Sequence, residues 1–572
     1  LARPVFGPRV ALIASALTAV YWIFIYFEGE LLAPVLLVLL VLAALVVLSS
    51  WMNRVTYWNA LLAGVLVGAL ALVRPNTLVL VPVALVWVWW IARRRRDSRR
   101  FRLALILFPI AVVVTIAPAT IRNYSVTGEF IPITSNAGIN FYIGNNPDTD
   151  CVSANAPGLG QVTTLSSWTC FDEPAIKAAV EKIVGRPLTS HEVSSFFTDK
   201  AWEFIGGHPG KAIEYAGKKA LLFWGPAEIS NNKVIHYERA HSKVLRFLPG
   251  FPVALALAIL GLALFIVENR KRTTAGAVTA GRSSRKIELS VLLIGFVGAY
   301  FASYLPFFIA GRYRVPVIPV MLIFGAYGID RVWTFAMAKR WGTAAVWVVV
   351  LAAAYGAARV PLVTYEPDLG MWHFDRGDAF RKQGKTEQAL DEFRFAADES
   401  TKQPAIAQNN LGVALDQMGR SGEAVEHFAK AVEANPRFLD ARRNLAAVLL
   451  KSNRIAEARV QFEAILRENP SDESARFRLG VCLLRESHYD EALRELSRVL
   501  ERNPRHLYAQ LFTIPHFRMA LQLGGENAEI RTELASCLKD AGKRAEAISE
   551  LERVLATNPN YGPARELLNG LK

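Results

Sequence analysis

Long apolar runs occupy the first 360 residues of the chain, and the pattern of polar and apolar positions changes after Tyr365. A helix that spans a bilayer needs roughly 17–25 residues. The runs that reach or approach this length are Val10–Phe27, Leu31–Trp51, Ala60–Ile91, Leu103–Ala119, Phe251–Val267, Leu289–Ile309, Val315–Val332 and Trp341–Val360. The pattern therefore predicts an all-α fold that begins with a polytopic bundle of transmembrane helices.

One of these runs, Ala60–Ile91, is interrupted by Arg74-Pro75-Asn76. Each arm holds about 14–16 residues, or roughly 21–24 Å of helix at 1.5 Å per residue. We expect a hairpin of two short helices with Arg74 at its tip. Backbone at this depth needs surrounding protein or a water-filled cavity, and a cation there favours a functional site.

The polar segment between the early and late apolar runs sets the expected domain boundaries. These are transmembrane helices at 1–119, an extracytoplasmic loop or subdomain at 120–248, transmembrane helices at 249–362 and a separate domain at 366–572. Within the polar segment, Ser135–Pro147 is rich in glycine and asparagine, as tight turns require. Asn145 and Asn146 are its candidate acceptor-loop residues. The amphipathic stretch Lys211–Trp224 fits a helix on the membrane surface and equally a helix packed on its own small domain.

The last part of the chain is repetitive. The pairs Asn435-Pro436, Asn469-Pro470 and Asn503-Pro504 recur at equal intervals, and Asn558-Pro559 follows an insertion. Small residues recur with them at Gly412, Ala446 and Gly480, where two helices could approach closely. The pattern and its period resemble the tetratricopeptide repeat, a pair of antiparallel helices of about 34 residues. The resemblance implies an α-solenoid that binds a protein partner.

Composition and charge agree with a membrane protein. The 572 residues are 52% hydrophobic with a net charge of +15. In a membrane protein a basic excess usually lies in cytoplasmic loops, so nucleic acid is not an expected partner. The basic clusters are Arg3 with Arg9, Arg93–Arg100, Asn269–Lys286, and Arg331 with Lys339 and Arg340. All four clusters fall on one side of the membrane if the chain crosses it nine times.

This alternation places Arg74, the turn Gly311–Arg314, the polar segment and the repeats on the side opposite the cytoplasm. We expect the bacterial inner membrane as the location, which makes that side periplasmic. Arg312, Tyr313 and Arg314 therefore lie where a cation needs an anionic partner. Guanidinium groups bind a phosphodiester or pyrophosphate through paired hydrogen bonds; the alternative is that they contact lipid headgroups.

Other candidate groups are weaker. Glu28 and Glu30 could orient an acceptor or act as a base, or they simply end a helix. Cys151 and Cys170 could form a disulfide outside the cytoplasm, or remain free thiols. The histidines show no metal-ligand spacing, and the sequence leaves a divalent metal open as a cofactor. No Walker loop, nucleotide fingerprint or Ser-His-Asp set is present.

Several stretches together resemble the GT-C superfamily of membrane glycosyltransferases, in the branch of protein mannosyltransferases and the aminoarabinose lipid A transferase. They are Glu30-Leu31-Leu32, Gly64–Gly68 leading to Ala71–Pro75, Arg122-Asn123-Tyr124, Gly138–Asn146 and Gly311–Pro319. The resemblance covers roughly the first 360 residues. It implies a transferase that moves a sugar from a polyprenyl-phosphate donor to a protein or glycolipid acceptor.

The resemblance also suggests roles for individual residues. Arg74, Arg312, Tyr313 and Arg314 match positions suited to the donor phosphate, and Glu30 matches a carboxylate near the acceptor. The family's usual acidic base lies on an earlier loop. The chain opens at Leu1 without a methionine, and we expect that loop upstream of it.

Two alternatives remain open. An O-antigen ligase or polymerase would move a whole glycan from a polyprenyl carrier. A non-enzymatic, membrane-anchored repeat scaffold would only assemble proteins. An acidic residue on the upstream loop would favour the transferase over the scaffold.

Overall fold

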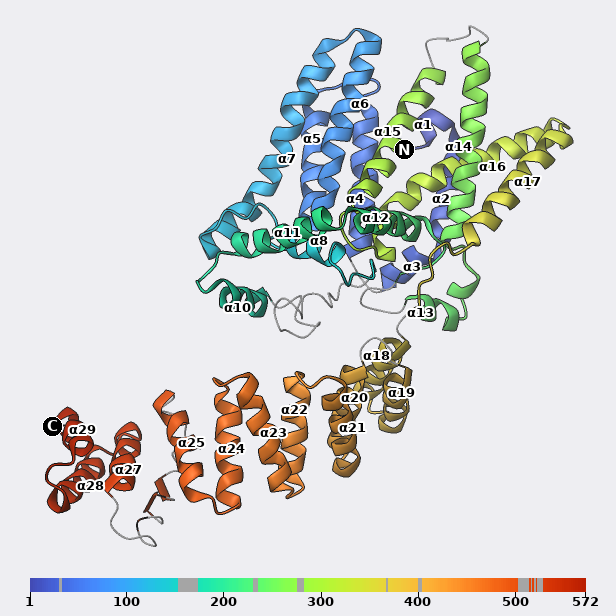
Figure 1. Cartoon of the computed structure of the whole chain (residues 1–572). Helices are drawn as coiled ribbons and strands as arrows, with labels where there is room; N and C mark the ends of the chain where they lie inside the picture. Colours follow the sequence, from blue (N-terminus) through green and yellow to red (C-terminus); the bar gives the residue numbers. More distant parts are fainter. Residues whose placement is uncertain are drawn as a thin grey trace. The chain divides into compact units, whose positions relative to one another are not determined.

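The structure is a computed structural model that describes residues 1–29, 33–152, 173–229, 235–274, 282–366, 369–399, 404–502, 514–515, 517–518, 521 and 528–571. Every regular element in these ranges is a helix, which confirms the all-α fold class (Figure 1). The chain divides into two compact units, Leu1–Pro367 and Asp368–Lys572.

The first unit contains long apolar helices and several short ones. Its elements are α1 (Arg3–Phe6), α2 (Pro8–Ala19), α3 (Trp22–Gly29), α4 (Ala33–Ser50), α5 (Tyr57–Val73), η1 (Pro75–Val79), α6 (Leu80–Arg95), α7 (Ser98–Thr127), α8 (Ala137–Gly144), α10 (Glu173–Val184), α11 (Ser190–Gly207), α12 (Pro209–Trp224), α13 (Ile235–His241), η3 (Leu245–Phe247), α14 (Phe251–Thr274), α15 (Arg282–Ala302), η4 (Gly311–Tyr313), η5 (Val315–Val317), α16 (Ile318–Met337) and α17 (Trp341–Arg359).

Five helical stretches in the described residues are long and apolar enough to cross a membrane. They are Pro75–Arg95, Ser98–Thr127, Leu245–Arg270, Gly311–Met337 and Trp341–Arg359. Their outer surfaces are apolar: Val113 and Val114 on α7 and Val349 on α17 are each more than 60% exposed. Exposed aliphatic side chains in this number are typical of helices that face lipid.

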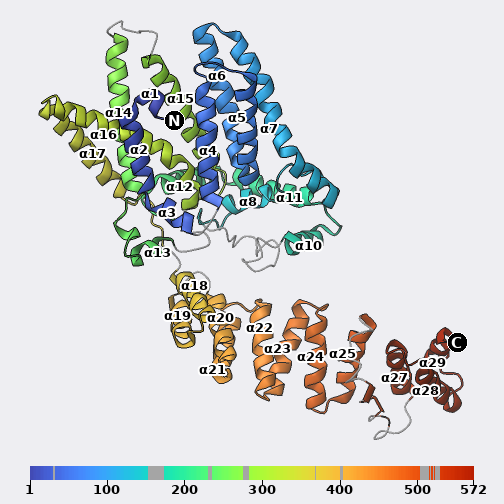
Figure 2. The same ribbon diagram turned by 180° about the vertical axis from the view of Figure 1, so that it is seen from behind.

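Glycines bring helices of the bundle into close contact. In both views α5, α6 and α7 lie side by side (Figures 1 and 2). A Cβ added at Gly64 on α5 would lie 2.5 Å from the Ala111 Cβ on α7, and one at Gly68 would lie 2.6 Å from the Thr115 Cβ. Small residues four apart allow such close packing, as they do between transmembrane helices.

In two of the expected spans, the helix ends before the apolar run does. The run Val10–Phe27 forms two helices, α2 and α3, that meet at Val20 and Tyr21. Tyr21, Trp22 and Ile23 are all buried, and a straight helix cannot turn three consecutive side chains toward one face. The run Leu289–Ile309 leaves its helix at Ala302, and beyond it the Ile309 N–H donates to the Cys151 carbonyl at 2.8 Å.

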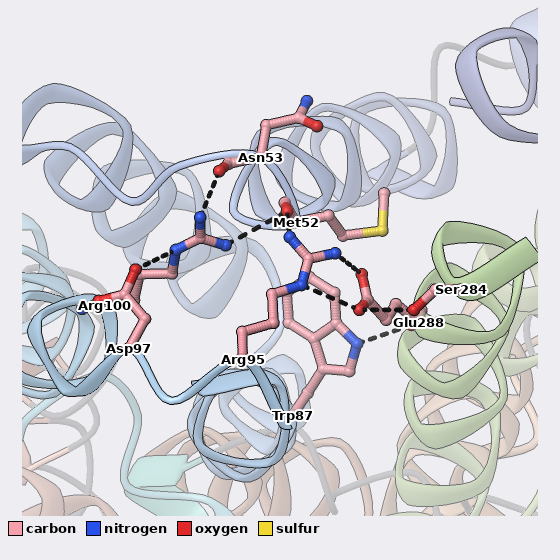
Figure 3. Close-up of polar contacts among 8 residues, drawn as sticks. All are labelled: Met52, Asn53, Trp87, Arg95, Asp97, Arg100, Ser284 and Glu288. Carbon is pink, nitrogen blue, oxygen red and sulfur yellow. Dashed lines mark hydrogen bonds and ion pairs between the residues drawn. The ribbon is translucent and has the colours of Figure 1, made fainter. Parts of the chain in front are cut away.

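Polar contacts join α6, α7 and α15 to the segment after α4 at one end of the bundle (Figure 3). Arg95 on α6 forms an ion pair of 2.6 Å with Glu288 on α15, and also donates to the Met52 carbonyl. Trp87 Nε1 donates to the Glu288 carbonyl at 2.7 Å, and Ser284 donates to the Glu288 carboxylate at 3.3 Å.

Arg100 extends this contact to the start of α7. It pairs with Asp97 at 2.7 Å and donates to the Asn53 carbonyl at 2.7 Å (Figure 3). Two of the basic clusters, Arg93–Arg100 and the one that begins α15, therefore meet at one end of the bundle. The elements α8, α11 and α12 lie at the other end (Figures 1 and 2).

The second unit is a series of helix pairs. Its helices are α18 (Leu369–Lys382), α19 (Thr386–Glu399), α20 (Pro404–Gln417), α21 (Ser421–Ala434), α22 (Leu439–Lys451), α23 (Ile455–Glu468), α24 (Glu473–Arg485), α25 (Tyr489–Arg502), α27 (Ala528–Asp540), α28 (Arg544–Thr557) and α29 (Gly562–Leu571). A Cβ at Gly412 would lie 2.8 Å from the Phe428 ring, and one at Gly480 would lie 2.7 Å from Leu496. The close approach predicted at these small residues is therefore confirmed.

The turn inside each helix pair also repeats. The residues with positive φ at this position are Gly384, Gly419, Asn453, Ser487 and Gly542. Glycine and asparagine adopt this left-handed conformation readily, and it reverses the chain between antiparallel helices. Ser487 keeps the conformation without such a preference, which shows that the repeat imposes it.

Candidate site: an arginine–tyrosine cluster at the end of the bundle

Arg74 lies at the hairpin tip that the sequence predicts. Pro75 follows it and disfavours helical backbone at the residue before it, and Arg74 is extended with φ −154° and ψ 108°. Thr77 Oγ1 donates to the Arg74 carbonyl at 2.8 Å, and Asn76 Nδ2 donates to the Ser303 carbonyl at 3.0 Å. The tip is therefore fixed against the end of α15.

The Arg74 guanidinium contacts two tyrosines. Its Nη1 donates to the Tyr304 hydroxyl at 3.0 Å, and its Cζ lies 4.5 Å from the centre of the Tyr313 ring. The two rings stack with centres 4.7 Å apart and planes at 21°. The Tyr300 hydroxyl lies 3.2 Å from the Tyr304 hydroxyl and continues the contact into α15.

Arg312 approaches the same ring from η4. Its Cζ lies 5.6 Å from the Tyr313 ring centre, and its buried Nε has no hydrogen-bond partner in the described part of the chain. No described carboxylate lies within ion-pair distance of Arg74 or Arg312. We refer to Arg74, Tyr300, Tyr304, Arg312 and Tyr313 as the arginine–tyrosine cluster. It brings two cations together with phenol hydroxyls and no described counter-ion.

Arg314 belongs to a different environment. It is 2% exposed and forms an ion pair of 2.7 Å with Glu228, which is 4% exposed. It also donates to the carbonyls of Gly225 and Ala227 at 2.7 Å each. Its charge is compensated and its Nη1 and Nη2 donors bind protein, whereas its buried Nε has no described hydrogen-bond partner. Because of the compensated charge, we leave Arg314 out of the candidate site and assign it to holding the segment before Ser230. No sequence signal pointed to Glu228 as its partner.

Asn145 and Asn146 are buried at the end of α8. Asn145 Nδ2 donates to the carbonyls of Phe141 and Pro306 at 2.8 and 2.6 Å, and Asn146 Nδ2 donates to the Tyr142 carbonyl at 2.9 Å. Asn145 ties α8 to the segment that follows Tyr304. These contacts give both amides a positioning role.

The same region contains a lysine that the sequence pattern did not single out. Lys219 on α12 is 1% exposed, and its Nζ donates to Asn145 Oδ1 at 3.3 Å. Burial lowers its pKa to about 8, and the nearby Cys151 thiol opposes this shift. The amphipathic pattern of α12 did not indicate this burial, because a lysine on an amphipathic helix is ordinarily expected to be solvent-exposed.

Three predicted positions lie outside the described residues. They are Glu30, the side chain of Glu28 at the end of α3, and Cys170. Cys151 is buried, and its pairing with Cys170 stays a prediction. In the described part of the chain no group of three His, Cys, Asp or Glu residues could hold a metal ion.

Comparisons with known proteins concern the second unit. Family models described as tetratricopeptide repeat match residues 374–437, 417–474 and 449–512. No curated protein matches the chain.

Solved structures similar to the chain include YrrB, titled a TPR protein with an unusual peptide-binding site, at 21% identity over 34% of this chain and 90% of that one, with a TM-score of 0.23. A tetratricopeptide repeat protein from Parabacteroides merdae is 17% identical over 36% of this chain and 86% of that one, with a TM-score of 0.25. MamA from Desulfovibrio magneticus is 18% identical over 35% and 99%, with a TM-score of 0.24. The matched family models, together with the repeated helix pairs, identify the C-terminal region as tetratricopeptide repeats.

Proposed function

We propose that the chain is a membrane-embedded glycosyltransferase that uses a sugar carried on polyprenyl phosphate and recruits a protein through its repeat unit. The observation that carries the proposal is the arginine–tyrosine cluster. Arg74 and Arg312 come from segments far apart in the chain, yet both lie against the Tyr313 ring without a described carboxylate. Two such cations at the end of an apolar bundle need an anion, and a lipid phosphate supplies one.

The chemistry is consistent with this assignment. When the glycosidic bond to a lipid phosphate breaks, negative charge grows on the phosphate oxygens. Guanidinium groups that are already fixed in a region of low dielectric stabilise that charge without reorganising. Stacking holds Tyr304 and Tyr313 in place, and through them the two arginines. No described residue is assigned as the general base that activates the acceptor. Glu30 stays the sequence-based candidate for a carboxylate near the acceptor.

The arrangement of charges along the bundle supports the periplasmic assignment of the cluster. The basic ends of α6 and α15 meet at Arg95 and Glu288. Arg74 instead contacts Tyr304, close to the Pro306 carbonyl that accepts a hydrogen bond from Asn145, the residue that follows α8. The helix α8 lies at the opposite end of the bundle (Figures 1 and 2). If the basic end faces the cytoplasm, the cluster faces the periplasm, where sugar donors are lipid-linked rather than nucleotide-linked.

A second candidate is a membrane-anchored scaffold without enzymatic activity. Tetratricopeptide repeats fit a protein-interaction unit. In addition, Arg314, one of the four predicted phosphate-binding residues, is paired with Glu228 instead of being free for a ligand. This candidate needs no ligand at the arginine–tyrosine cluster, which makes binding of a lipid phosphate the deciding measurement.

The test uses the full chain in lipid nanodiscs with undecaprenyl phosphate as the probe and intrinsic fluorescence as the readout. Arg74→Ala and Arg312→Ala should each weaken binding by roughly tenfold or more, the loss expected for a charge-assisted hydrogen bond. The matched control is Arg93→Ala, because the Arg93 Cζ lies 4.2 Å from the Trp89 ring centre at the other end of the bundle. Equal affinity in all three variants would reject the transferase and leave the scaffold.

A further inference from the structure

The short turn from Gly311 to Arg314 carries two residues of the arginine–tyrosine cluster, and it is held at both ends. At its start, the Gly311 N–H donates to the Ile229 carbonyl at 2.8 Å. At its end, Arg314 forms the ion pair of 2.7 Å with Glu228. The two cluster residues inside the turn therefore lie between anchored neighbours.

Both anchors belong to residues 223–229, which begin at the end of α12 and which we call the anchoring segment. Arg314 Nη1 donates to the carbonyls of Phe223 and Gly225 at 3.3 and 2.7 Å. Arg314 Nη2 donates to the Ala227 carbonyl at 2.7 Å. A guanidinium presents its donors in a rigid planar arrangement, so these bonds fix the end of the turn on the anchoring segment.

Gly311 allows the start of the turn to lie directly against the same segment. Gly311 is buried. A Cβ added there would lie 3.1 Å from the Ile229 carbonyl oxygen and 3.2 Å from Glu228 Oε2. At such distances the neighbouring atoms must move by a few tenths of an ångström to admit a methyl group. A side chain at this position would therefore displace the turn from the segment or the segment from the turn.

The direction of Arg312 depends on the backbone of this turn. Its Cζ lies 5.6 Å from the Tyr313 ring centre, and its buried Nε has no hydrogen-bond partner in the described residues. A contact with the face of a ring directs a guanidinium less strictly than paired hydrogen bonds do. The Tyr313 ring also contacts Arg74 and stacks on Tyr304. A displaced turn would therefore disturb the contacts of both cations.

We propose that the anchoring segment positions Arg312 for the lipid phosphate, with Gly311 and Glu228 as positioning residues. Gly311 acts through the backbone of the turn, and Glu228 acts through Arg314. Neither residue contacts the phosphate. A small displacement of a binding group weakens its interactions strongly, which gives the anchors an effect on affinity. The inference rests on the proposed function, because it concerns the same phosphate site.

The first test is a double-mutant cycle on the full chain in nanodiscs, with undecaprenyl phosphate as the probe. Gly311→Ala should weaken binding by roughly fivefold, because displaced charge-assisted hydrogen bonds lose part of their strength. In a chain that already carries Arg312→Ala, the same substitution should change the affinity little, since Gly311 acts through Arg312. A general structural defect would instead weaken binding by the same factor in both backgrounds.

Gly328→Ala is the matched control for crowding. A Cβ at Gly328 on α16 would lie 3.0 Å from the Gly261 nitrogen and 3.1 Å from the Gly261 Cα on α14. The two substitutions therefore add the same methyl group at contacts of similar tightness. Gly328→Ala should lower the thermal unfolding midpoint at least as much as Gly311→Ala does, and it should leave the affinity for undecaprenyl phosphate unchanged.

A second variant tests the other anchor. Arg314→Met combined with Glu228→Leu removes both buried charges together, so the protein should keep part of the stability that a single substitution loses. The turn nevertheless loses its hydrogen bonds to the anchoring segment, and binding should weaken by roughly fivefold. Binding equal to that of the wild type in this folded variant would exclude a positioning role for Glu228.

Other outcomes separate this inference from the proposed function. The positioning role is overturned if Gly311→Ala and Gly328→Ala bind the probe equally, or if the effect of Gly311→Ala is undiminished beside Arg312→Ala. If the wild type does not bind the probe, or if Arg74→Ala and Arg312→Ala bind it as the wild type does, the proposed function fails. The positioning role then fails with it.

Discussion

Arg314 Nη2 lies 2.7 Å from Glu228 Oε2, and both side chains are almost completely buried. Arg314 is separated by one residue from Arg312, which lies in the arginine–tyrosine cluster. Two arginines of one short turn therefore serve different purposes. One neutralises an internal carboxylate, and the other has no described counter-ion.

Removing the acidic partner should be costly. Glu228→Ala leaves a buried guanidinium without compensation, and such losses destabilise proteins by about 3–5 kcal/mol. We expect a large fall in the thermal unfolding midpoint of the detergent-solubilised protein. Arg314→Met combined with Glu228→Leu removes both charges and should recover part of the loss. A double variant less stable than Glu228→Ala would contradict this account of the pair.

The glycine contact between α5 and α7 gives a second prediction. A methyl group at Gly64 would lie 2.5 Å from both the Ala111 Cβ and the Phe108 carbonyl oxygen, so Gly64→Ala should destabilise the protein by about 1–3 kcal/mol through overpacking. Gly298 on α15 is the control, because a Cβ there meets nothing within 4 Å. Gly298→Ala should be neutral or stabilising by roughly 0.5–1 kcal/mol. The thermal unfolding midpoints of the two variants test this prediction. Equal shifts of the midpoint in both variants would argue against close packing at Gly64.

Lys219 predicts a dependence of stability on pH. Its pKa is about 8 in the folded protein and 10.5 ordinarily. Below pH 8 both the folded and unfolded states carry the charge, and the cost of burying it is fully present. Between pH 8 and 10.5 the folded state releases the proton first, so this contribution to stability rises with pH.

Comparison with a variant isolates that contribution. Lys219→Met has no titrating group, so the difference in unfolding midpoint between wild type and variant should shift in favour of the wild type from pH 7 to pH 10. Circular dichroism melts of both proteins at each pH measure it. Parallel curves would mean that Lys219 is not buried as described.

Tyr304→Phe probes the arginine–tyrosine cluster without removing a charge. The hydroxyl accepts from Arg74 at 3.0 Å, and its loss leaves the guanidinium less well oriented. Binding of undecaprenyl phosphate should weaken by roughly fivefold, which corresponds to about 1 kcal/mol. The effect should therefore be smaller than that of Arg74→Ala. A larger effect would place Tyr304, rather than Arg74, in direct contact with the phosphate.

Patterns that recur along the chain can be predicted from sequence, and contacts between distant segments cannot. The repeat unit is predictable because each small residue, such as Gly412 or Gly480, is supported by its equivalents in neighbouring repeats. The hairpin at Arg74 is predictable because proline and charge interrupt a uniform apolar run. In contrast, Glu228 and Lys219 are single residues with no periodic signal, and their roles depend on segments far away in the chain.

The same limit explains the broken span near the start of the chain. Hydropathy reports how apolar Val10–Phe27 is, but not that Tyr21, Trp22 and Ile23 must all be enclosed. Burial on consecutive positions is a property of the surrounding helices. Asn145 is likewise an acceptor-loop candidate by its sequence context, whereas in the structure its amide holds the Pro306 carbonyl.

The Arg95–Glu288 pair has a consequence for biogenesis. Glu288 is 1% exposed and lies on a helix that the ribosome completes long after Arg95. A buried carboxylate is costly when it has no partner. Because synthesis starts at the amino end, Arg95 is already present when α15 emerges, and its guanidinium is available to compensate Glu288 as soon as that helix packs.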